Sequence, residues 1–133
     1  MDWQIAADDA LHILLRQSRI GLITDVDGTI SPIVDEPDAA QVTPRARELL
    51  AALRPHLTLV AVVSGRAADD VRERVGVPGL VTVGNHGLET WADGAVQLAP
   101  EAAAYRPALE AACAALSDAL LPGMHVEDKG ATL

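Results

Sequence analysis

The chain has 133 residues, 50% of them hydrophobic, and its 19 acidic against 10 basic side chains give a net charge of −9. This length and apolar content suit a compact globular fold and argue against global disorder. A surface this acidic should be repelled by nucleic acid and by anionic membranes, so neither is expected as a partner. The first residues carry acids where a secretory signal needs bases, and no apolar run approaches the length of a membrane span. We therefore expect a cytoplasmic protein.

Hydrophobic patterning predicts strands that alternate with helices over the first part of the chain. Strands are expected at residues 20–24, 57–63 and 80–83, and helices at residues 9–17, 44–53 and 67–75. This alternation predicts an α/β fold with parallel strands and right-handed crossovers. Further along, Asp93-Gly94 predicts a hairpin turn, followed by an Ala-rich helix at residues 100–121 and a strand at residues 124–127.

The most informative stretch is residues 20–30, where a β-branched apolar run ends in D-x-D-G-T. On an extended strand Asp25 and Asp27 share a face, because Val26 between them points the other way. Two carboxylates this close to a buried strand are costly unless a divalent cation or a shared proton stabilises them. The simpler alternative is a solvated Asp-Gly turn after a strand.

A strand that ends in D-x-D-G-T resembles the first motif of the haloacid dehalogenase superfamily of phosphatases. The resemblance implies that Asp25 is the nucleophile that forms an aspartyl phosphate, and that Asp27 protonates the leaving oxygen and later activates water. It also implies a Mg²⁺ ion, held by the carboxylate of Asp25 and the backbone carbonyl of Asp27. Thr29 is expected to hold the loop and to contact the phosphate.

The second strand ends in Ser64-Gly65-Arg66, which resembles the second motif of the same superfamily. The resemblance implies that the Ser64 hydroxyl and the neighbouring amides bind phosphoryl oxygens. Gly65 permits a close approach of the backbone, and the helix from Ala67 would direct its N-terminal dipole at the anion. Taken alone, this tripeptide would more often be an ordinary helix cap.

A third stretch, G-N-H-G-x-E at Gly84–Glu89, resembles the trehalose-6-phosphate phosphatases, and V-E-D-K-G at Val126–Gly130 resembles a strand of their cap domain. The resemblance implies that several side chains border the cleft between core and cap and contact the phosphate or the sugar: Arg66, Asn85, His86, Glu89 and Lys129. The alternative for the residues at 85, 86 and 89 is a polar turn with a capping role.

By this resemblance residues 1–95 form the N-terminal part of the phosphatase core, and residues 96–133 form the beginning of an α+β cap. The lysine and the later acidic pair that superfamily cores carry after the cap are not found, since Lys129 matches the cap strand. We therefore expect an incomplete Rossmann-like parallel sheet of the haloacid dehalogenase type. Its open edge should favour association with a missing C-terminal half.

The expected function is magnesium-dependent hydrolysis of trehalose 6-phosphate to trehalose and phosphate through an aspartyl phosphate. One alternative is another sugar-phosphate phosphatase of the superfamily, acting on mannosylglycerate or sucrose phosphates. A second alternative is a non-catalytic binding or assembly fragment. A phosphatase assay with added magnesium distinguishes the enzymes from the fragment.

Overall fold

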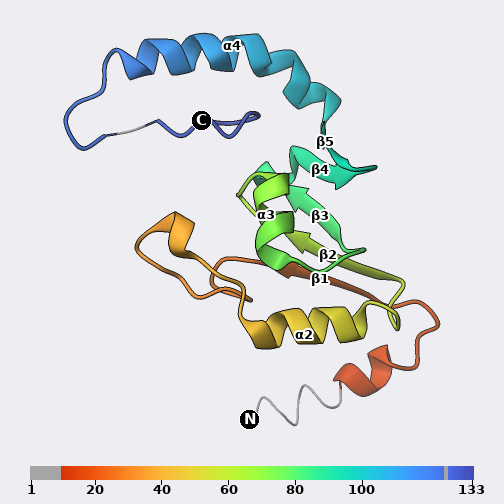
Figure 1. Cartoon of the computed structure of the whole chain (residues 1–133). Coiled ribbons are helices and arrows are strands. Elements are labelled where there is room, and N and C mark those ends of the chain that lie inside the picture. Colours follow the sequence, from red (N-terminus) through yellow and green to blue (C-terminus); the bar gives the residue numbers. More distant parts are fainter. Residues whose placement is uncertain (1–9, 125) are drawn as a thin grey trace.

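The computed structural model describes residues 10–124 and 126–133. Residues 10–14 are helical, so the helix predicted at residues 9–17 ends earlier than predicted. Residue 9, the first of the predicted helix, lies outside the described residues. The elements that follow are shown in Figure 1: β1 Gly21–Asp25, η1 Pro37–Ala39, α2 Pro44–Leu53, β2 Leu59–Val63, α3 Ala68–Val75, β3 Val81–Gly84, η2 Asn85–Gly87, β4 Glu89–Ala92, β5 Ala95–Leu98 and α4 Pro100–Ser117.

The strands form one sheet in the order β1-β2-β3-β4-β5. β1, β2 and β3 are parallel, as predicted, while β4 and β5 are antiparallel to their neighbours. The hairpin turn predicted at Asp93-Gly94 is confirmed, because both residues adopt positive φ angles, 53° and 84°, between β4 and β5. The sheet therefore continues across residue 95, where the boundary between core and cap was predicted.

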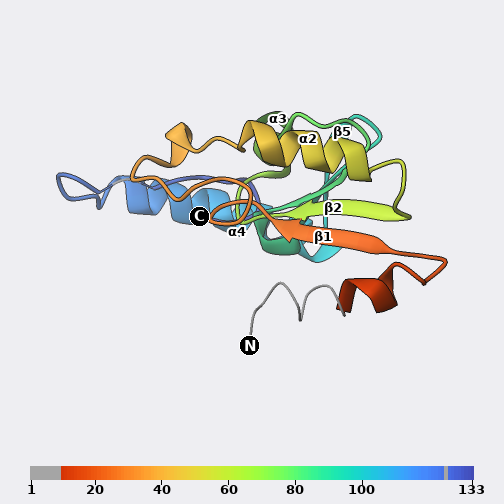
Figure 2. The ribbon, with the colours of Figure 1, turned by 90° about the horizontal axis from the view of Figure 1, so that it is seen from below.

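The hydrophobic core lies between the sheet and the two helices α2 and α3, which cover the same face of the sheet (Figure 2). Its buried members are mostly valines: Val26, Val42, Leu50, Val60, Val62, Val71 and Val75. Helix α2 begins as predicted, because the Thr43 side chain accepts a hydrogen bond from Ala46 N at 3.2 Å and Pro44 follows the cap. Among the described residues, no helix is long and apolar enough to cross a membrane.

The C-terminal part differs from the prediction. Helix α4 ends at Ser117 and not at residue 121, and of its side chains only Ala102 is buried. The strand predicted at residues 124–127 is wrong for the three of these residues that are described, which have no strand conformation. A strand needs a hydrogen-bonded neighbour, and within the described ranges no strand pairs with this segment.

Candidate active site

The two aspartates flank Val26 at the carboxyl end of β1, where the backbone forms a fixed turn. The amides of residues 29, 30 and 31 all donate to the carbonyl oxygen of Val26, at 3.2, 3.0 and 2.9 Å. Gly28 has a φ of 82°, in the left-handed region that favours glycine. Val26 itself is 1% exposed and anchors the turn in the core. The carboxylates on either side are therefore held at the sheet edge by buried backbone.

Asp25 and Asp27 have different surroundings. The Asp25 side chain is exposed, and one of its oxygens, Oδ2, accepts a long hydrogen bond of 3.4 Å from Thr29 Oγ1. The Asp27 side chain is half-buried, and both of its oxygens accept hydrogen bonds from Arg66. Asp25 is thus the freer of the two carboxylates, as a nucleophile requires, while Asp27 is held in one orientation.

The predicted phosphate-binding residues Ser64 and Gly65 lie beside the end of β1. Asp25 pairs with Val63 in the parallel ladder, so the residue that follows β2 is next to the β1 turn. Ser64 is 4% exposed. A side chain at Gly65 would place its Cβ 2.6 Å from Cε1 of His86, so the missing Cβ lets the His86 ring pack against the backbone there. The structure therefore brings the first, second and third motifs together.

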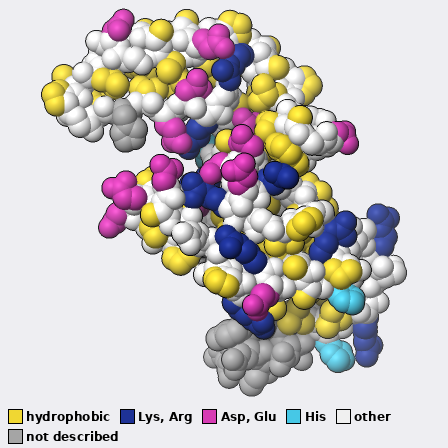
Figure 3. All heavy atoms as spheres, in the orientation of Figure 1, with side chains coloured by type: hydrophobic (Ala, Val, Ile, Leu, Met, Phe, Trp, Pro, Cys, Tyr) yellow, Lys and Arg dark blue, Asp and Glu magenta, His cyan; other side chains and the backbone are white. Residues whose placement is uncertain are grey.

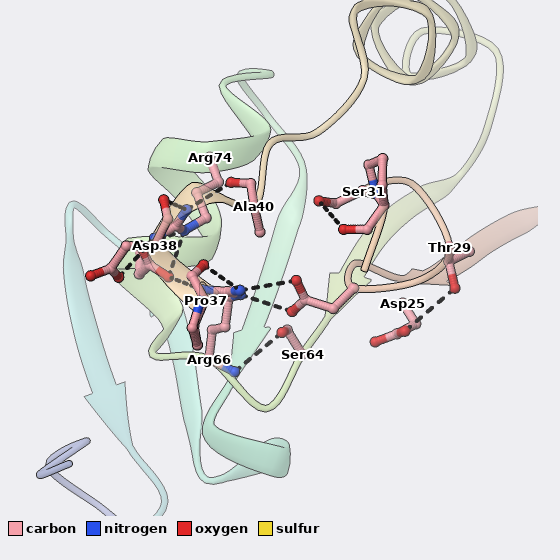
Figure 4. A network of polar contacts seen from close by, with 12 residues as sticks. Asp25, Thr29, Ser31, Pro37, Asp38, Ala40, Ser64, Arg66 and Arg74 are labelled. Carbon is pink, nitrogen blue, oxygen red and sulfur yellow. Dashed lines mark hydrogen bonds and ion pairs between the residues drawn. The ribbon is translucent and has the colours of Figure 1, made fainter. Parts of the chain in front are cut away.

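Arg66 is the centre of a network of charged side chains (Figure 4). Besides Asp27, its guanidinium contacts Asp70 Oδ2 at 3.5 Å and donates to the carbonyl of Pro37 at 2.9 Å. Asp70 in turn accepts from Arg74 Nε at 2.8 and 2.9 Å. The hydrogen bond to Asp27 raises the pKa of the Arg66 guanidinium above its ordinary value, so this side chain stays charged. Sequence analysis placed Arg66 at the substrate, whereas the structure pairs it with protein groups.

Asn85, Glu89 and Lys129 form a second cluster, which joins the C-terminal segment to the core. Asn85 is fully buried and donates to Glu89 Oε1 at 3.1 Å and to the carbonyl of Lys129 at 2.7 Å. Glu89 is 4% exposed, and its Oε2 accepts from Ala68 N at 2.9 Å. The first amide of α3, which was expected to face an anion, is therefore occupied by Glu89. The predicted contacts of these side chains with the sugar stay predictions.

The turn that carries Asn85 and His86 is strained. Both residues have positive φ angles, 50° and 58°, a backbone conformation that two successive residues other than glycine rarely adopt. Main-chain bonds hold the turn, since Asn85 N donates to the Arg66 carbonyl at 2.7 Å and His86 N to the Ser64 carbonyl at 3.1 Å. The strain places the exposed His86 ring against Gly65, at the end of β2.

Sequence analysis missed three charged residues of the site: Asp70, Arg74 and Arg106. Residues 66, 70 and 74 alternate in charge at a spacing of four, which is the spacing of neighbouring side chains on a helix face, and this signal could have found Asp70 and Arg74. Arg106 donates to the carbonyl of Gly130 at 3.0 Å and so ties α4 to the C-terminal segment. No pattern in the sequence indicates that last contact.

Acidic and basic side chains gather around α3 on the face shown in Figure 3. β1 ends here in Asp25, with Asp27 two residues further on, and Ser64 and Gly65 follow the end of the neighbouring parallel strand β2, in an α/β core of the fold class that the sequence predicts. The family model for trehalose-phosphatase matches residues 23–133. The chain belongs to the trehalose-phosphatase family.

Relatives in mycobacteria are similar over most of this chain. It is 46% identical over 108 residues to the trehalose-phosphate phosphatase of Mycobacterium leprae, a match that covers 79% of this chain and 25% of the relative. It is 44% identical over 129 residues to the trehalose-phosphate phosphatase of Mycobacterium ulcerans, covering 91% and 33%. The chain thus spans between a quarter and a third of the length of these relatives.

Solved structures of similar proteins share the fold. The C-terminal domain of the Candida albicans trehalose-6-phosphate phosphatase has a TM-score of 0.71 at 20% identity, covering 92% of this chain and 44% of that one. A trehalose-6-phosphate phosphatase related protein has a TM-score of 0.68 at 18% identity, covering 84% and 48%. At these identities the likeness establishes the fold, which is that of the predicted class.

Proposed function

We propose that this chain carries the nucleophile and the acid–base residue of a magnesium-dependent phosphatase that hydrolyses trehalose 6-phosphate to trehalose and phosphate. The observation that carries the proposal is the end of β1, where the exposed Asp25 carboxylate lies two residues from the half-buried Asp27 in a chain of the trehalose-phosphatase family. The relatives named trehalose-phosphate phosphatase favour this substrate over other sugar phosphates.

In the proposed reaction a carboxylate oxygen of Asp25 attacks phosphorus, and the bond between phosphorus and the sugar oxygen breaks as Asp27 gives that oxygen a proton. Trehalose leaves, and Asp25 becomes an aspartyl phosphate. Asp27, now ionised, takes a proton from a water molecule as that water attacks phosphorus. The bond between phosphorus and Asp25 then breaks, which releases inorganic phosphate and restores both carboxyl groups. Thr29, Ser64 and Gly65 are proposed to bind the phosphoryl oxygens.

Mg²⁺ is proposed to bind the Asp25 carboxylate and the Asp27 backbone carbonyl, which are oxygen ligands of the kind that this ion prefers. No described main-chain amide donates to that carbonyl, so it is free to bind a cation. The described part of the chain contains no group of three or more His, Cys, Asp or Glu side chains placed to hold a metal. Further ligands would therefore be water, phosphate or other protein groups. When bound, the ion would neutralise charge on the phosphoryl oxygens.

We propose that residues 1–95 belong to the phosphatase core and residues 96–133 to the beginning of the cap. Helix α4 extends away from the sheet in Figure 1, which supports a division between the sheet and α4, while β5 still belongs to the sheet up to Leu98. A pocket of about 510 Å³ lies between the two parts and is lined by charged side chains. We propose that it binds the disaccharide, because charged and polar groups that hydrogen-bond sugar hydroxyls discriminate well between sugars. Its charged lining residues are Asp69, Glu89, Arg106, Asp128 and Lys129.

The free edge of the sheet at β1 is the proposed contact for a C-terminal half of the kind that the longer relatives carry. Among the described strands β1 pairs with β2 alone, and the apolar side chains of Ile23, Leu49 and Leu53 around this edge are exposed. A groove of about 550 Å³ runs between β1 and α2. A buried type of parallel strand with an open edge favours pairing with another chain. The groove's apolar lining fits a strand or helix of such a half.

Expressed alone, the 133 residues are therefore expected to self-associate and to release no phosphate from trehalose 6-phosphate. Light scattering and a phosphate-release assay measure the two properties together. Ile23→Lys should lower the association, because a charge on an edge strand opposes pairing. Leu121→Lys, at a residue that is 66% exposed after α4, is the matched control and should change it little. A monomer that turns over trehalose 6-phosphate would contradict this prediction.

The proposed activity is best tested on a completed chain, in which residues 1–133 are followed by the part of the Mycobacterium ulcerans relative that lies beyond the matched region. With Mg²⁺ it should release phosphate from trehalose 6-phosphate faster than from sucrose or mannosylglycerate phosphates, and a chelator should stop the release. Faster release from one of the other sugar phosphates would favour the alternative enzyme. No release from any of them would favour the non-catalytic fragment.

Glu89→Ala should destabilise the completed chain by about 2 to 4 kcal/mol, because it leaves the buried donors of Ala68 and Asn85 without their acceptor. Glu89→Gln keeps one acceptor oxygen and should cost less. Urea denaturation measures both changes. If Glu89 also contacts the sugar, Glu89→Ala lowers turnover of trehalose 6-phosphate far more than turnover of p-nitrophenyl phosphate. An equal loss on both substrates would leave Glu89 with the structural role alone.

A further inference from the structure

We propose that Arg66 is a positioning residue, which fixes the Asp27 carboxylate for its proton transfers and does not itself contact the substrate. This inference rests on the proposed function, in which Asp27 is the acid and the base. Arg66 Nε donates to Asp27 Oδ2 at 2.8 Å, and Arg66 Nη2 donates to Asp27 Oδ1 at 3.1 Å. Such a two-point contact fixes both the place of a carboxylate and the plane in which it lies.

The guanidinium of Arg66 is occupied by protein groups on all three nitrogens. Nη2 also donates to the Pro37 carbonyl at 2.9 Å, and Nη1 contacts Asp70 Oδ2 at 3.5 Å. The side chain is 16% exposed. A phosphate or sugar that approached the site would have to displace these partners. Arg66 is therefore better suited to hold Asp27 than to bind the substrate.

Arg66 is itself braced from two sides, as Figure 4 shows. On the side of α3, Asp70 is held by Arg74, and Arg74 Nη1 donates to the carbonyls of Asp38 and Ala40 at 3.2 and 2.8 Å. On the other side, the backbone of Arg66 is fixed, because the Arg66 amide donates to Ser64 Oγ at 3.1 Å. The loop before α2 and the start of α3 thus hold the guanidinium in place.

The contact leaves Asp27 able to exchange protons. Each of its oxygens accepts one hydrogen bond from Arg66, and a carboxylate oxygen has two lone pairs, so one remains on each oxygen for the leaving group or for water. A catalytic group that is held in a productive orientation reacts faster than one that rotates freely. Arg66 would therefore increase the rate of the steps that need Asp27 and leave the others unchanged.

The test compares aryl phosphates in the completed chain, because a poor leaving group needs a proton and a good one does not. In Arg66→Met, kcat/KM for phenyl phosphate should fall by on the order of a hundredfold. For 2,4-dinitrophenyl phosphate it should fall by no more than about threefold, since that leaving group departs as an anion without help from an acid. Arg66→Lys, which keeps the charge but not the two-point contact, should lie between wild type and Arg66→Met.

Two controls make the outcomes separable. Arg72→Met removes an exposed arginine of the same helix, which lies over the Trp91 ring at 4.4 Å and takes no part in the network around Arg66, and it should leave the leaving-group dependence of kcat/KM unchanged. Asp27→Asn should steepen the leaving-group dependence at least as much as Arg66→Met. If Asp27→Asn does so and neither Arg66 variant does, Arg66 is not a positioning residue. If Asp27→Asn does not, the proposed role of Asp27 fails, and this inference fails with it.

Discussion

Replacing Asp25 by asparagine in the completed chain should lower turnover of trehalose 6-phosphate by more than about a thousandfold. An amide oxygen is a poor nucleophile toward phosphorus, and among the described residues no other exposed carboxylate lies at the end of β1. Asp27 cannot replace it, because Arg66 holds the Asp27 carboxylate in one orientation. Phosphate release under saturating substrate measures the loss.

Asp93→Asn is the control for Asp25→Asn. It also removes one carboxylate, but at the tip of the β4–β5 hairpin, where asparagine tolerates the φ of 53°. This variant should keep the turnover of the unchanged protein. Near-normal turnover in Asp25→Asn would show that Asp25 is not the nucleophile, whatever the family resemblance implies.

Replacing Gly84 by alanine should destabilise the fold by about 3 kcal/mol or more, or prevent folding altogether. The added Cβ would lie 2.6 Å from Cα of Ala68 and 2.8 Å from the carbonyl carbon of Ala67. These are backbone atoms at the start of α3, so no side chain can rotate away to make room. The φ of Gly84 is −113°, in the extended region, so the expected effect is steric and not conformational.

Urea denaturation of the completed chain measures the effect of Gly84→Ala, and Gly21→Ala on β1 is its control. A Cβ at residue 21 would meet Leu59 Cβ at 3.5 Å, an ordinary van der Waals contact. This control should change the free energy of unfolding by less than about 1 kcal/mol. Equal stability of the two variants would contradict the close approach of β3 and α3 that positions the turn at residues 85–87.

The motifs that predicted the site are short, and in the structure each lies at the strand end or helix start that its own residues predict. D-x-D-G-T follows a buried strand, and S-G-R follows the strand that pairs with it, so parallel pairing alone brings Asp25 and Ser64 to one edge. Thr43-Pro44 likewise specifies the start of α2 through one hydrogen bond between near neighbours. Short motifs of this kind could therefore be predicted from the sequence, because the contacts that form them lie within the motif or follow from the pairing of neighbouring strands.

The contacts that sequence analysis did not predict join residues far apart in the chain. Arg66 and Asp27 are 39 residues apart, and their pairing depends on how α3 packs beside the turn after β1. Glu89 was assigned to the sugar because of its motif. Its burial against the Ala68 amide depends on the antiparallel pairing of β4, which turns its side chain towards α3.

The incorrect prediction at residues 124–127 has the same origin. A short apolar run has strand character on its own, but a strand forms only beside a partner, and the pairing partner is not set by the run itself. Among the described strands β1 and β5 form the edges of the sheet, and neither pairs with this segment. The segment that follows is held to the core by side chains instead, through Asn85 and Arg106.

The covalent intermediate provides the most direct test of the proposed function. The completed chain is stopped with acid during turnover of trehalose 6-phosphate, treated with borohydride, which reduces an acyl phosphate to an alcohol, and digested for mass spectrometry. We expect residue 25 to be recovered as homoserine, and Asp25→Asn to show no reduction. Turnover with the phosphate found instead on Asp27, Ser64 or His86, or with no covalent intermediate at all, would contradict the assignment of Asp25 as the nucleophile.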